Sequence, residues 1–295
     1  MDSGVIYPAG RIDLRLAPTG VVLLIERQCG LAFSCDLRRC LLTFTPMLQA
    51  PTNQLTETSL TSFARRNLIF ILGTLLLLLI NAYLLATANQ GDALIAINKL
   101  RSPFWDTFFK AGTRLAEPVA YLIVVLVVSA YSHRRGIFSV VAGAAAGIVA
   151  GTLKVFFAQA RPMRWFFDNF EEVWHSLQHF EEAYRNWSAV SSFPSGHATS
   201  AFALYGFLAF SARRSKSWIG LLCLTLASVV AFSRMYLLYH FLRDVTVGAG
   251  LGLCLGAIVY FLQRRLFPRA YKLDRGWLEL LEKTPKAQQT VPPPE

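Results

Sequence analysis

The hydrophobic residues of the chain gather into six long runs that are separated by shorter polar segments. The runs cover residues 67–86, 117–132, 136–158, 197–211, 217–232 and 245–266. A helix needs roughly 20 apolar residues to cross the hydrocarbon core of a bilayer, and the runs approach that length, although the second and fourth are short. The pattern therefore predicts an all-α integral membrane protein, built as a bundle of six transmembrane helices.

The regions before and after the runs lack this regular pattern. Residues 1–66 carry turn-forming and charged residues, and the end of the chain is basic and then proline-rich. We expect a poorly ordered extension over 1–66, a six-span domain over 67–268 and a flexible cytoplasmic tail over 269–295. The apolar stretch at 21–26 is too short for a cleavable signal peptide, and Met47 is a candidate start of native translation.

The segment between the third and fourth runs, residues 165–187, is too charged to cross lipid. Its large apolar side chains recur at spacings of three and four, and acidic side chains lie on the other face. The apolar stripe is Phe166, Phe170, Trp174, Leu177, Phe180, Tyr184 and Trp187, and the acidic face is Asp168, Glu171, Glu172, Glu181 and Glu182. This pattern predicts an amphipathic helix in the outer membrane interface, and it fits a helix packed on the outer ends of the bundle equally well.

Three side chains of that segment raise the question of a metal site. Glu171, His175 and His179 follow one another at i, i+4 spacing, which would place three ligands on one side of a helix. A polar helix face with two histidines needs no metal to explain it. We therefore expect neither a metal nor another cofactor.

The basic residues indicate how the spans are oriented. The chain has a formal net charge of +11, but its cations flank the hydrophobic runs and form no groove-reading motif, so nucleic acid is not an expected partner. The flanking cations are Arg65, Arg66, Arg134, Arg135, Arg213, Arg214, Lys216, Arg264, Arg265, Arg269 and Lys272. By the positive-inside rule both termini are cytoplasmic, and the loops after the first, third and fifth runs face outward. The expected location is a bacterial inner membrane.

Composition agrees with this picture and gives no sign of a disulfide framework. Hydrophobic residues make up 54% of the chain and charged residues 16%, unlike an ordinary soluble domain. Cys29, Cys35 and Cys40 lie in the amino-terminal extension, whereas Cys223 and Cys254 lie within spans. No cysteine falls in a predicted outer loop, so we expect no disulfide framework.

Two spans contain glycines at every fourth position. Gly143, Gly147 and Gly151 form one such strip, and Gly248, Gly252 and Gly256 form the other. Small residues at this spacing allow helix backbones to approach closely. We expect the third and sixth spans to be neighbours, which would bring Lys154 and Asp244 together at the outer surface. Packing of either strip against other helices or lipid is the alternative.

The first of three polar clusters is the stretch KVFFAQARP at 154–162. Lys154 and Arg161 are seven residues apart, so a helix continued to Arg161 would project both cations from nearly the same face. Pro162 makes that continuation unfavourable. A lone lysine at the end of a span more often reaches for water.

The second and third clusters each add a histidine. In PSGH at 194–197, Ser195 can cap the helix that follows, and the free amides of a helix start attract anions beside His197. In SRMYLLYHFLRD at 233–244, His240 and Asp244 are four apart and can meet on one helix face. A carboxylate orients an imidazole and makes its opposite nitrogen a better nucleophile or base. Taken singly, each cluster also fits an ordinary structural role.

The predicted topology places all three clusters at the outer ends of the spans. Three cations, two histidines, one carboxylate and a helix start then converge. Fixed cations and backbone amides suit the equatorial oxygens of a phosphoryl group in transfer. This reasoning from the residues does not decide which histidine would attack.

The three clusters together resemble a known signature. Lys-x6-Arg-Pro, Pro-Ser-Gly-His and Ser-Arg-x5-His-x3-Asp are similar, in order and internal spacing, to the motifs of the type 2 phosphatidic acid phosphatase and vanadium haloperoxidase superfamily, in its membrane lipid phosphatase branch. The resemblance implies a metal-independent phosphatase in which His240 attacks phosphorus, Asp244 orients it and His197 protonates the leaving oxygen. It assigns phosphate binding to Lys154, Arg161, Ser195, Gly196 and Arg234.

The same resemblance narrows the expected activity. It implies hydrolysis of a lipid phosphate or pyrophosphate through a phosphohistidine, with undecaprenyl pyrophosphate, phosphatidic acid, phosphatidylglycerol phosphate and phosphorylated lipid A as candidate substrates. A lipid-to-lipid phosphotransferase is the alternative among enzymes, and a phospholipid transporter is the alternative without chemistry. A lipid phosphate and the surrounding membrane lipids are the expected partners, and no obligate protein partner is inferred.

Overall fold

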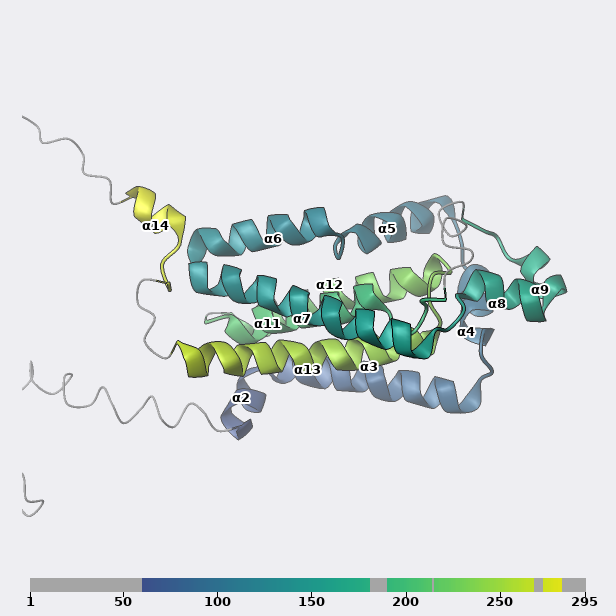
Figure 1. The fold of residues 1–295 in the computed structure, drawn as a ribbon, viewed down its shortest axis with the longest axis horizontal. Coiled ribbons are helices and arrows are strands. Elements are labelled where there is room, and N and C mark those ends of the chain that lie inside the picture. The colour runs from purple at the N-terminus through teal and green to yellow at the C-terminus, as the bar shows by residue number, and fades with distance from the viewer. Residues whose placement is uncertain (1–59, 181–189, 214, 268–272, 283–295) are drawn as a thin grey trace, which may run out of the picture. The chain divides into compact units, whose positions relative to one another are not determined.

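The computed structural model describes residues 60–180, 190–213, 215–267 and 273–282, and this part of the chain is helical without strands. Long helices run side by side along the bundle, as Figure 1 shows. They are α3 (Leu68–Thr87), α7 (His133–Phe157), α11 (Gly196–Ser211), α12 (Lys216–Tyr236), α13 (Leu242–Leu266) and the consecutive pair α5 (Pro103–Arg114) and α6 (Pro118–Tyr131). Shorter helices are α2 (Leu60–Arg66), α4 (Asp92–Asn98), α8 (Pro162–Asn169), α9 (Glu171–Ser176) and α14 (Trp277–Glu282).

Each of the six hydrophobic runs forms a helix, but not all of these helices meet the length expected of a span. Within the described residues, four helical stretches are long and apolar enough to cross a membrane: α3, residues 133–169, α12 and α13. The pair α5 and α6, bent by 60° at a short break, would make a fifth. The chain is therefore an integral membrane protein. Length and composition identify four or five spans in the described residues, compared with the six that the sequence predicted.

The second predicted span differs most from expectation. It forms only α6, which has 14 residues, and the chain before the break adds α5. The sequence of α5 carries Asp106, Lys110 and Arg114 between aromatic residues, so it has no long apolar run. Pro118 stands at the first turn of α6, where a proline is tolerated at the start of a helix but not inside one.

The centre of the bundle is α11, the fourth predicted span. It has 16 residues, of which most are buried, and it packs against α7, α12 and α13. Small side chains make this enclosure possible: a Cβ atom added at Gly252 of α13 would lie 2.5 Å from the Thr199 carbonyl oxygen, and one at Gly256 would lie 2.9 Å from that of Ala203. The glycine strip of α13 thus seats this helix directly on α11.

The predicted pairing of two glycine strips is therefore wrong, although α7 and α13 are neighbours as expected. On α7, no atom of another described segment would lie within 4 Å of a Cβ added at Gly147 or Gly151, and Gly143 faces Tyr121. The contact between α7, α11 and α13 is made by larger side chains, among them Phe138 and Val259. The central helix α11, which the glycine pattern did not indicate, takes the position that we expected α7 to occupy.

The segment after α7 is not one continuous helix. The backbone leaves the helical conformation at Phe170, between α8 and α9, and the second helix ends at Ser176. Phe166, Leu177 and Phe180 are buried in the main core, which favours packing on the bundle over a helix lying free in the interface. The rest of the predicted stripe, at 181–189, lies outside the described residues.

The flanking regions are mostly outside the described residues, including Met47 and Cys29, Cys35 and Cys40. Within them the structure shows the short helices α2 and α14. Cys223 and Cys254 are free thiols.

Candidate active site

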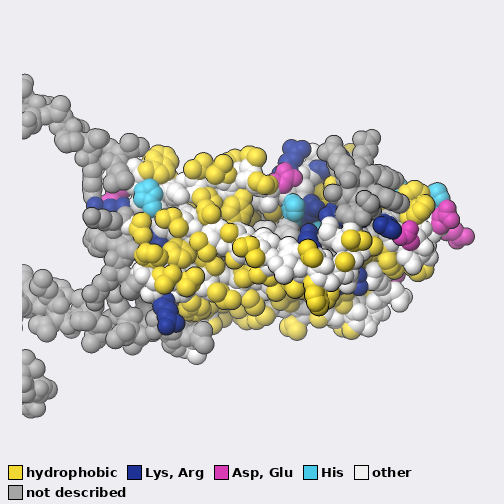
Figure 2. All heavy atoms as spheres, in the orientation of Figure 1, with side chains coloured by type: hydrophobic (Ala, Val, Ile, Leu, Met, Phe, Trp, Pro, Cys, Tyr) yellow, Lys and Arg dark blue, Asp and Glu magenta, His cyan; other side chains and the backbone are white. Residues whose placement is uncertain are grey.

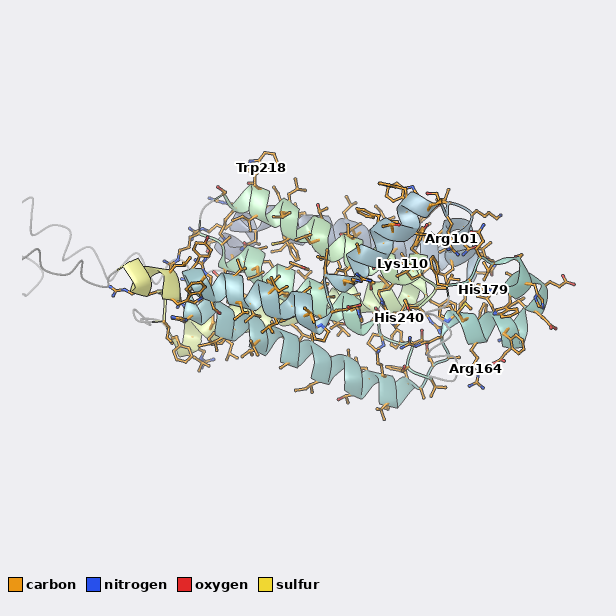
Figure 3. The ribbon with its side chains drawn as sticks, turned by 90° about the horizontal axis from the view of Figure 1, so that it is seen from above. Arg101, Lys110, Arg164, His179, Trp218 and His240 are labelled. Carbon is orange, nitrogen blue, oxygen red and sulfur yellow. The ribbon has the colours of Figure 1, made fainter. Side chains whose placement is uncertain are left out.

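The three sequence motifs occupy the ends of five helices. Lys154 lies in the last turn of α7, Arg161 directly precedes α8, and His197 is in the first turn of α11. The third motif runs from the last turn of α12 to the first turn of α13 and contains His240. Figure 3 shows His240 inside the bundle, towards the end that carries α8 and α9.

Asp244 joins the second motif to the third. Its carboxylate is fully buried, and Oδ2 accepts hydrogen bonds from the Ser192 hydroxyl at 2.5 Å and from the Phe241 amide at 3.0 Å. The Ser195 amide donates to the Asp244 carbonyl oxygen at 3.0 Å. Two donors on one oxygen hold the carboxylate in a single orientation. Ser192 was not predicted as part of the site, because a serine in a loop carries no spacing signal.

His240 faces this carboxylate. Its Nδ1 lies 3.6 Å from Oδ2 of Asp244, which is longer than a hydrogen bond. The side chain is about as buried as the carboxylate, and this burial lowers the pKa of His240 to about 4 against the opposing effect of Asp244. The imidazole is therefore neutral at ordinary pH, with Nδ1 on the carboxylate side and Nε2 directed elsewhere.

The backbone that carries His240 is tightly turned. Both the Tyr239 and the His240 amides donate to the carbonyl oxygen of Arg234, at 2.9 and 3.2 Å. Leu238, which directly precedes Tyr239, adopts a left-handed conformation with φ of 59°, which costs a non-glycine residue of the order of 1 kcal/mol. The turn folds Tyr239 and His240 back against the end of α12.

Cations from the first and third motifs gather around His197. Its side chain interacts electrostatically with four charged or titratable groups, which are Arg234, His240, Lys154 and Arg161. Lys154 also approaches the start of α11, because a Cβ added at Gly196 would lie 3.7 Å from its Nζ. The three motifs therefore meet in one place, as the sequence predicted.

Ser195 takes the expected capping role. Its hydroxyl accepts from the Ala198 amide at 3.4 Å at the start of α11, and the side chain is buried. Nearby, Nη2 of Arg161 donates to the Ser191 hydroxyl at 3.3 Å. Nε of Arg161 and Nε of Arg234 are buried and have no hydrogen-bond partner among the described residues.

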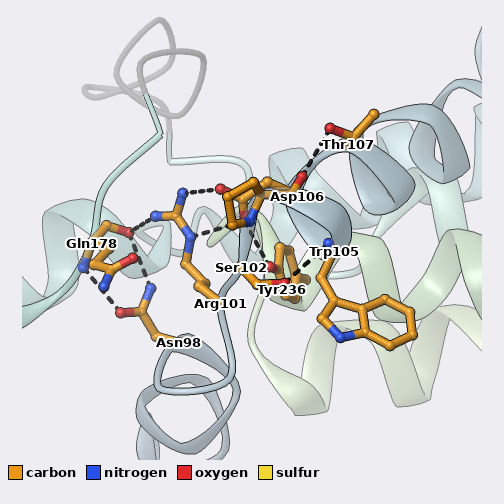
Figure 4. Close-up of polar contacts among 9 residues, drawn as sticks. Asn98, Arg101, Ser102, Trp105, Asp106, Thr107, Gln178 and Tyr236 are labelled. Carbon is orange, nitrogen blue, oxygen red and sulfur yellow. Dashed lines mark hydrogen bonds and ion pairs between the residues drawn. The ribbon is translucent and has the colours of Figure 1, made fainter.

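The helix α5 also reaches the site, which the sequence did not indicate. Nη1 of Arg234 donates to the Thr113 hydroxyl at 2.7 Å. Further towards the start of α5, Asp106 accepts hydrogen bonds from Arg101 and from the Tyr236 hydroxyl. Figure 4 shows this network. Arg101 and Asn98 both bond to Gln178, so the same network ties the segment after α9 to α5.

Polar side chains are visible on the side of the bundle. Figure 2 shows basic, acidic and histidine side chains close together where α5 meets α6, on a face that is otherwise largely hydrophobic. Lys154, Arg161 and His197 are partly exposed, whereas Arg234 and His240 are buried. The site thus has a buried floor and an accessible rim.

The three side chains considered for a metal do not form a common site. Nε2 of His175 lies 3.8 Å from a carboxylate oxygen of Glu171, and Nε2 of His179 lies 2.8 Å from the Trp174 carbonyl oxygen. Within the part of the chain that the structure describes, no three His, Cys, Asp or Glu side chains are grouped so that they could hold a metal ion.

Comparison with known proteins shows which family the segment that carries the motifs resembles. The profile of the PAP2 superfamily matches residues 135–268, a segment that runs from α7 through α13 and contains all three motifs. The resemblance predicted from the motifs is thus confirmed for this segment.

The chain is also similar to individual proteins. The chain is 28% identical over 178 residues to a lipid A 4'-phosphatase of Bacteroides thetaiotaomicron, covering 60% of this chain and 77% of that protein. Among solved structures, it is similar to LpxE of Aquifex aeolicus at 22% identity and a TM-score of 0.47, over 58% of this chain and 94% of that one. It is also similar to a transmembrane PAP2-type phosphatidylglycerolphosphate phosphatase of Bacillus subtilis at 22% identity and a TM-score of 0.46, over 66% and 96%.

Proposed function

We propose that the protein is a membrane-embedded phosphatase that hydrolyses a lipid phosphate or pyrophosphate through a phosphohistidine. The observation that carries the proposal is the buried pair of His240 and Asp244 inside a group of three cations, with His197 beside it. Cations alone would suffice to bind an anionic head group. They give no reason for a buried imidazole with an orienting carboxylate and a second histidine.

In the first step His240 acts as the nucleophile. Its Nε2 forms a bond to phosphorus while the bond from phosphorus to the lipid oxygen breaks, and His197 gives a proton to that oxygen. Asp244 stabilises the positive charge that develops on the imidazole of His240. The oxygens of the transferring group are held by Lys154, Arg161, Arg234, Ser195 and the Gly196 amide.

In the second step water completes the reaction. A water molecule attacks phosphorus, the bond to Nε2 of His240 breaks, and His197 accepts the proton of the attacking water. Inorganic phosphate leaves, and both histidines return to their starting states. The route uses side chains of this chain throughout and includes no metal.

The surroundings of the site support a lipid substrate. Membrane-spanning helices enclose it, and its rim is open on the side of the bundle (Figure 2). A head group could enter there while its acyl or prenyl chains remain in the bilayer. We propose that the complete bundle has six spans and lies in a bacterial inner membrane with both termini cytoplasmic, that the site faces outward, and that α8 and α9 lie near the interface there.

Candidate substrates include phosphorylated lipid A, in line with the name of the Bacteroides thetaiotaomicron relative. Undecaprenyl pyrophosphate, phosphatidic acid and phosphatidylglycerol phosphate belong to the same chemical class. The shared requirement is a phosphate or pyrophosphate on a membrane-anchored chain.

A phosphate-release panel over these purified lipids tests the proposal. We expect the full-length protein in detergent to release phosphate from at least one lipid, with no acceptor lipid and in the presence of a chelator. His240→Ala should lower turnover by roughly 10⁴-fold or more, whereas His133→Ala, at the opposite end of the bundle, should not. Full activity of His240→Ala would refute His240 as the nucleophile, and no release from any lipid would leave only head-group binding. A strict need for an acceptor would indicate a phosphotransferase, and loss of activity with the chelator would contradict the metal-free route.

A further inference from the structure

Arg234 is the most enclosed of the three cations, and two side chains outside the motif positions hold it. Its residue is only 7% exposed, in the last turn of α12. Thr113 of α5 accepts a hydrogen bond from Nη1 at 2.7 Å. The ring of Tyr239 stacks on the guanidinium from another direction, with 4.1 Å between its centroid and Cζ.

The break between α5 and α6 explains how Thr113 reaches this position. The helix α5 packs against α12, and a Cβ added at Gly112 would lie 2.7 Å from Cγ1 of Val229. A glycine at this point therefore lets the last turn of α5 approach α12 closely, and the adjacent Thr113 meets Arg234. Because α6 starts at Pro118 in a direction bent by 60°, the contact comes at the very end of α5.

The two contacts restrain different movements of the guanidinium. A planar cation stacked on an aromatic ring is held in its plane, and a charge-assisted hydrogen bond at one corner stops rotation within that plane. Nε remains buried with no hydrogen-bond partner among the described residues. A buried donor of this kind costs free energy unless it binds an acceptor, and an anion in the site would supply one.

We propose that Thr113 and Tyr239 are positioning residues that fix the guanidinium of Arg234 for binding phosphoryl oxygens. The break between α5 and α6 is then a part of the phosphate site. This inference rests on the proposed function, because it assumes that the cation group receives a phosphate.

Tyr236 offers a matched control between the same two helices. Its hydroxyl donates to Oδ1 of Asp106 at 2.6 Å, so it also links α12 to α5 by a polar contact (Figure 4). Its ring lies against Phe109 and Phe180. Tyr236→Phe and Thr113→Val each delete one hydrogen bond between α5 and α12, and only the second changes the surroundings of the guanidinium.

The test measures binding of orthovanadate, a phosphoryl mimic, to the purified full-length protein by thermal stabilisation, together with phosphate release. We expect Thr113→Val to weaken orthovanadate binding about tenfold, which corresponds to one hydrogen bond to a charged group, and Thr113→Ser to restore it. Tyr239→Leu should weaken binding by a similar factor, and Tyr239→Phe should retain it because the ring stays. Tyr236→Phe should lower the melting temperature but leave the affinity unchanged.

Several results would overturn the inference. Thr113→Val with wild-type affinity, Thr113→Ser as weak as Thr113→Val, or an equal loss in Tyr236→Phe would reduce the contact to ordinary helix packing. If Thr113→Val does not yield folded protein, the orthovanadate affinities of Tyr239→Leu and Tyr239→Phe test the inference instead. An equal loss of affinity in both variants would show that the ring of Tyr239 does not position Arg234.

The two proposals can fail separately. Orthovanadate binding that depends on Thr113, without phosphate release from any lipid, would refute the phosphatase and support the positioning role. Phosphate release that is unchanged in Thr113→Val would support the phosphatase and refute the positioning role. Absence of orthovanadate binding to the wild-type protein would overturn both.

Discussion

The two ends of the bundle are both basic, yet they handle their cations in opposite ways. At the end near α14, Arg134 and Arg213 share Asp274, at 2.6 and 3.3 Å, and all three side chains are partly or largely exposed. Lys216 at the same end donates to the Asn67 side chain at 2.8 Å. These cations have solvent or polar partners, as expected for charges that orient a protein in a membrane.

At the other end, Arg234 is buried and Lys154 and Arg161 are only partly exposed. The nearby anions interact electrostatically with these cations: Asp244 with both Lys154 and Arg161, and Glu117 with Arg234. The Asp244 carboxylate is already engaged by His240, Ser192 and the backbone. Removing cations from water is costly unless an anion is close. The first end thus balances its cations with polar partners and solvent, whereas the second places a buried cation and two partly exposed ones together, which supports the proposed binding of a negatively charged ligand.

The largest expected effect is the loss of activity when the buried carboxylate of Asp244 is replaced. The matched control is the bridging carboxylate of Asp274 at the other end. Asp244→Asn keeps the shape of the side chain but removes the charge that stabilises the imidazole of His240, so kcat should fall by roughly 10²- to 10⁴-fold. Asp274→Asn removes an exposed partner of Arg134 and Arg213, whose ion pairs contribute about 1 kcal/mol or less to stability. Initial rates of phosphate release at saturating lipid compare kcat in the two variants.

If Asp244→Asn and Asp274→Asn lowered kcat equally, the catalytic site could not be assigned to the end of the bundle that carries Asp244. Circular dichroism and gel filtration of each variant in detergent serve as the control, because Asp244 is buried and its substitution must leave a folded protein for the rate to be meaningful. A normal rate in folded Asp244→Asn would remove the carboxylate from the mechanism.

The next effect concerns the cations themselves. Lys154→Met keeps the length and apolar stem of the side chain but loses the charge beside His197, so kcat/KM should fall by about 10²-fold. Arg213→Gln removes a cation of similar size at the opposite end and should change kcat/KM less than twofold. Competition by orthovanadate gives a second measure, since its inhibition constant should rise in Lys154→Met only. Parallel behaviour of the two variants would show that net charge, rather than the site, controls the rate.

The sequence predicted the part of the site that depends on spacing along helices. Lys154, His197 and His240 were placed together because each stands near the end of a hydrophobic run, and alternate runs end on the same side of a membrane. The pairing of His240 with Asp244 followed from their spacing of four residues. The structure brings these groups together.

Other features depend on contacts between distant segments, and no local pattern contains them. Thr113 lies 121 residues from its partner Arg234, in a helix that is too polar to be recognised as part of a span. Leu238 adopts a left-handed conformation that would be expected of glycine or asparagine. The stripe at 165–187 kept a helical period although the chain breaks at Phe170, because periodicity records which side chains face the core and not whether the backbone is continuous.

The smallest expected effect concerns stability against pH. Burial lowers the pKa of His240 to about 4 in the folded protein, whereas an unfolded histidine has a pKa of about 6.5. Between these values the unfolded chain binds a proton that the folded protein does not, so stability is lost as the pH falls below 6.5. From pH 7 to pH 5 the loss amounts to about 2 kcal/mol.

Replacing His240 should remove this part of the loss. His240→Asn cannot take up the proton, so its free energy of unfolding should fall by about 2 kcal/mol less than that of the wild type between pH 7 and pH 5. Denaturation of both proteins in mixed micelles at the two pH values measures the difference, and His133→Ala, at the solvent-facing end, controls for histidine content. If the wild type and His240→Asn lose the same free energy, His240 is not held neutral by burial. The contrast between the two ends would then rest on the cations alone.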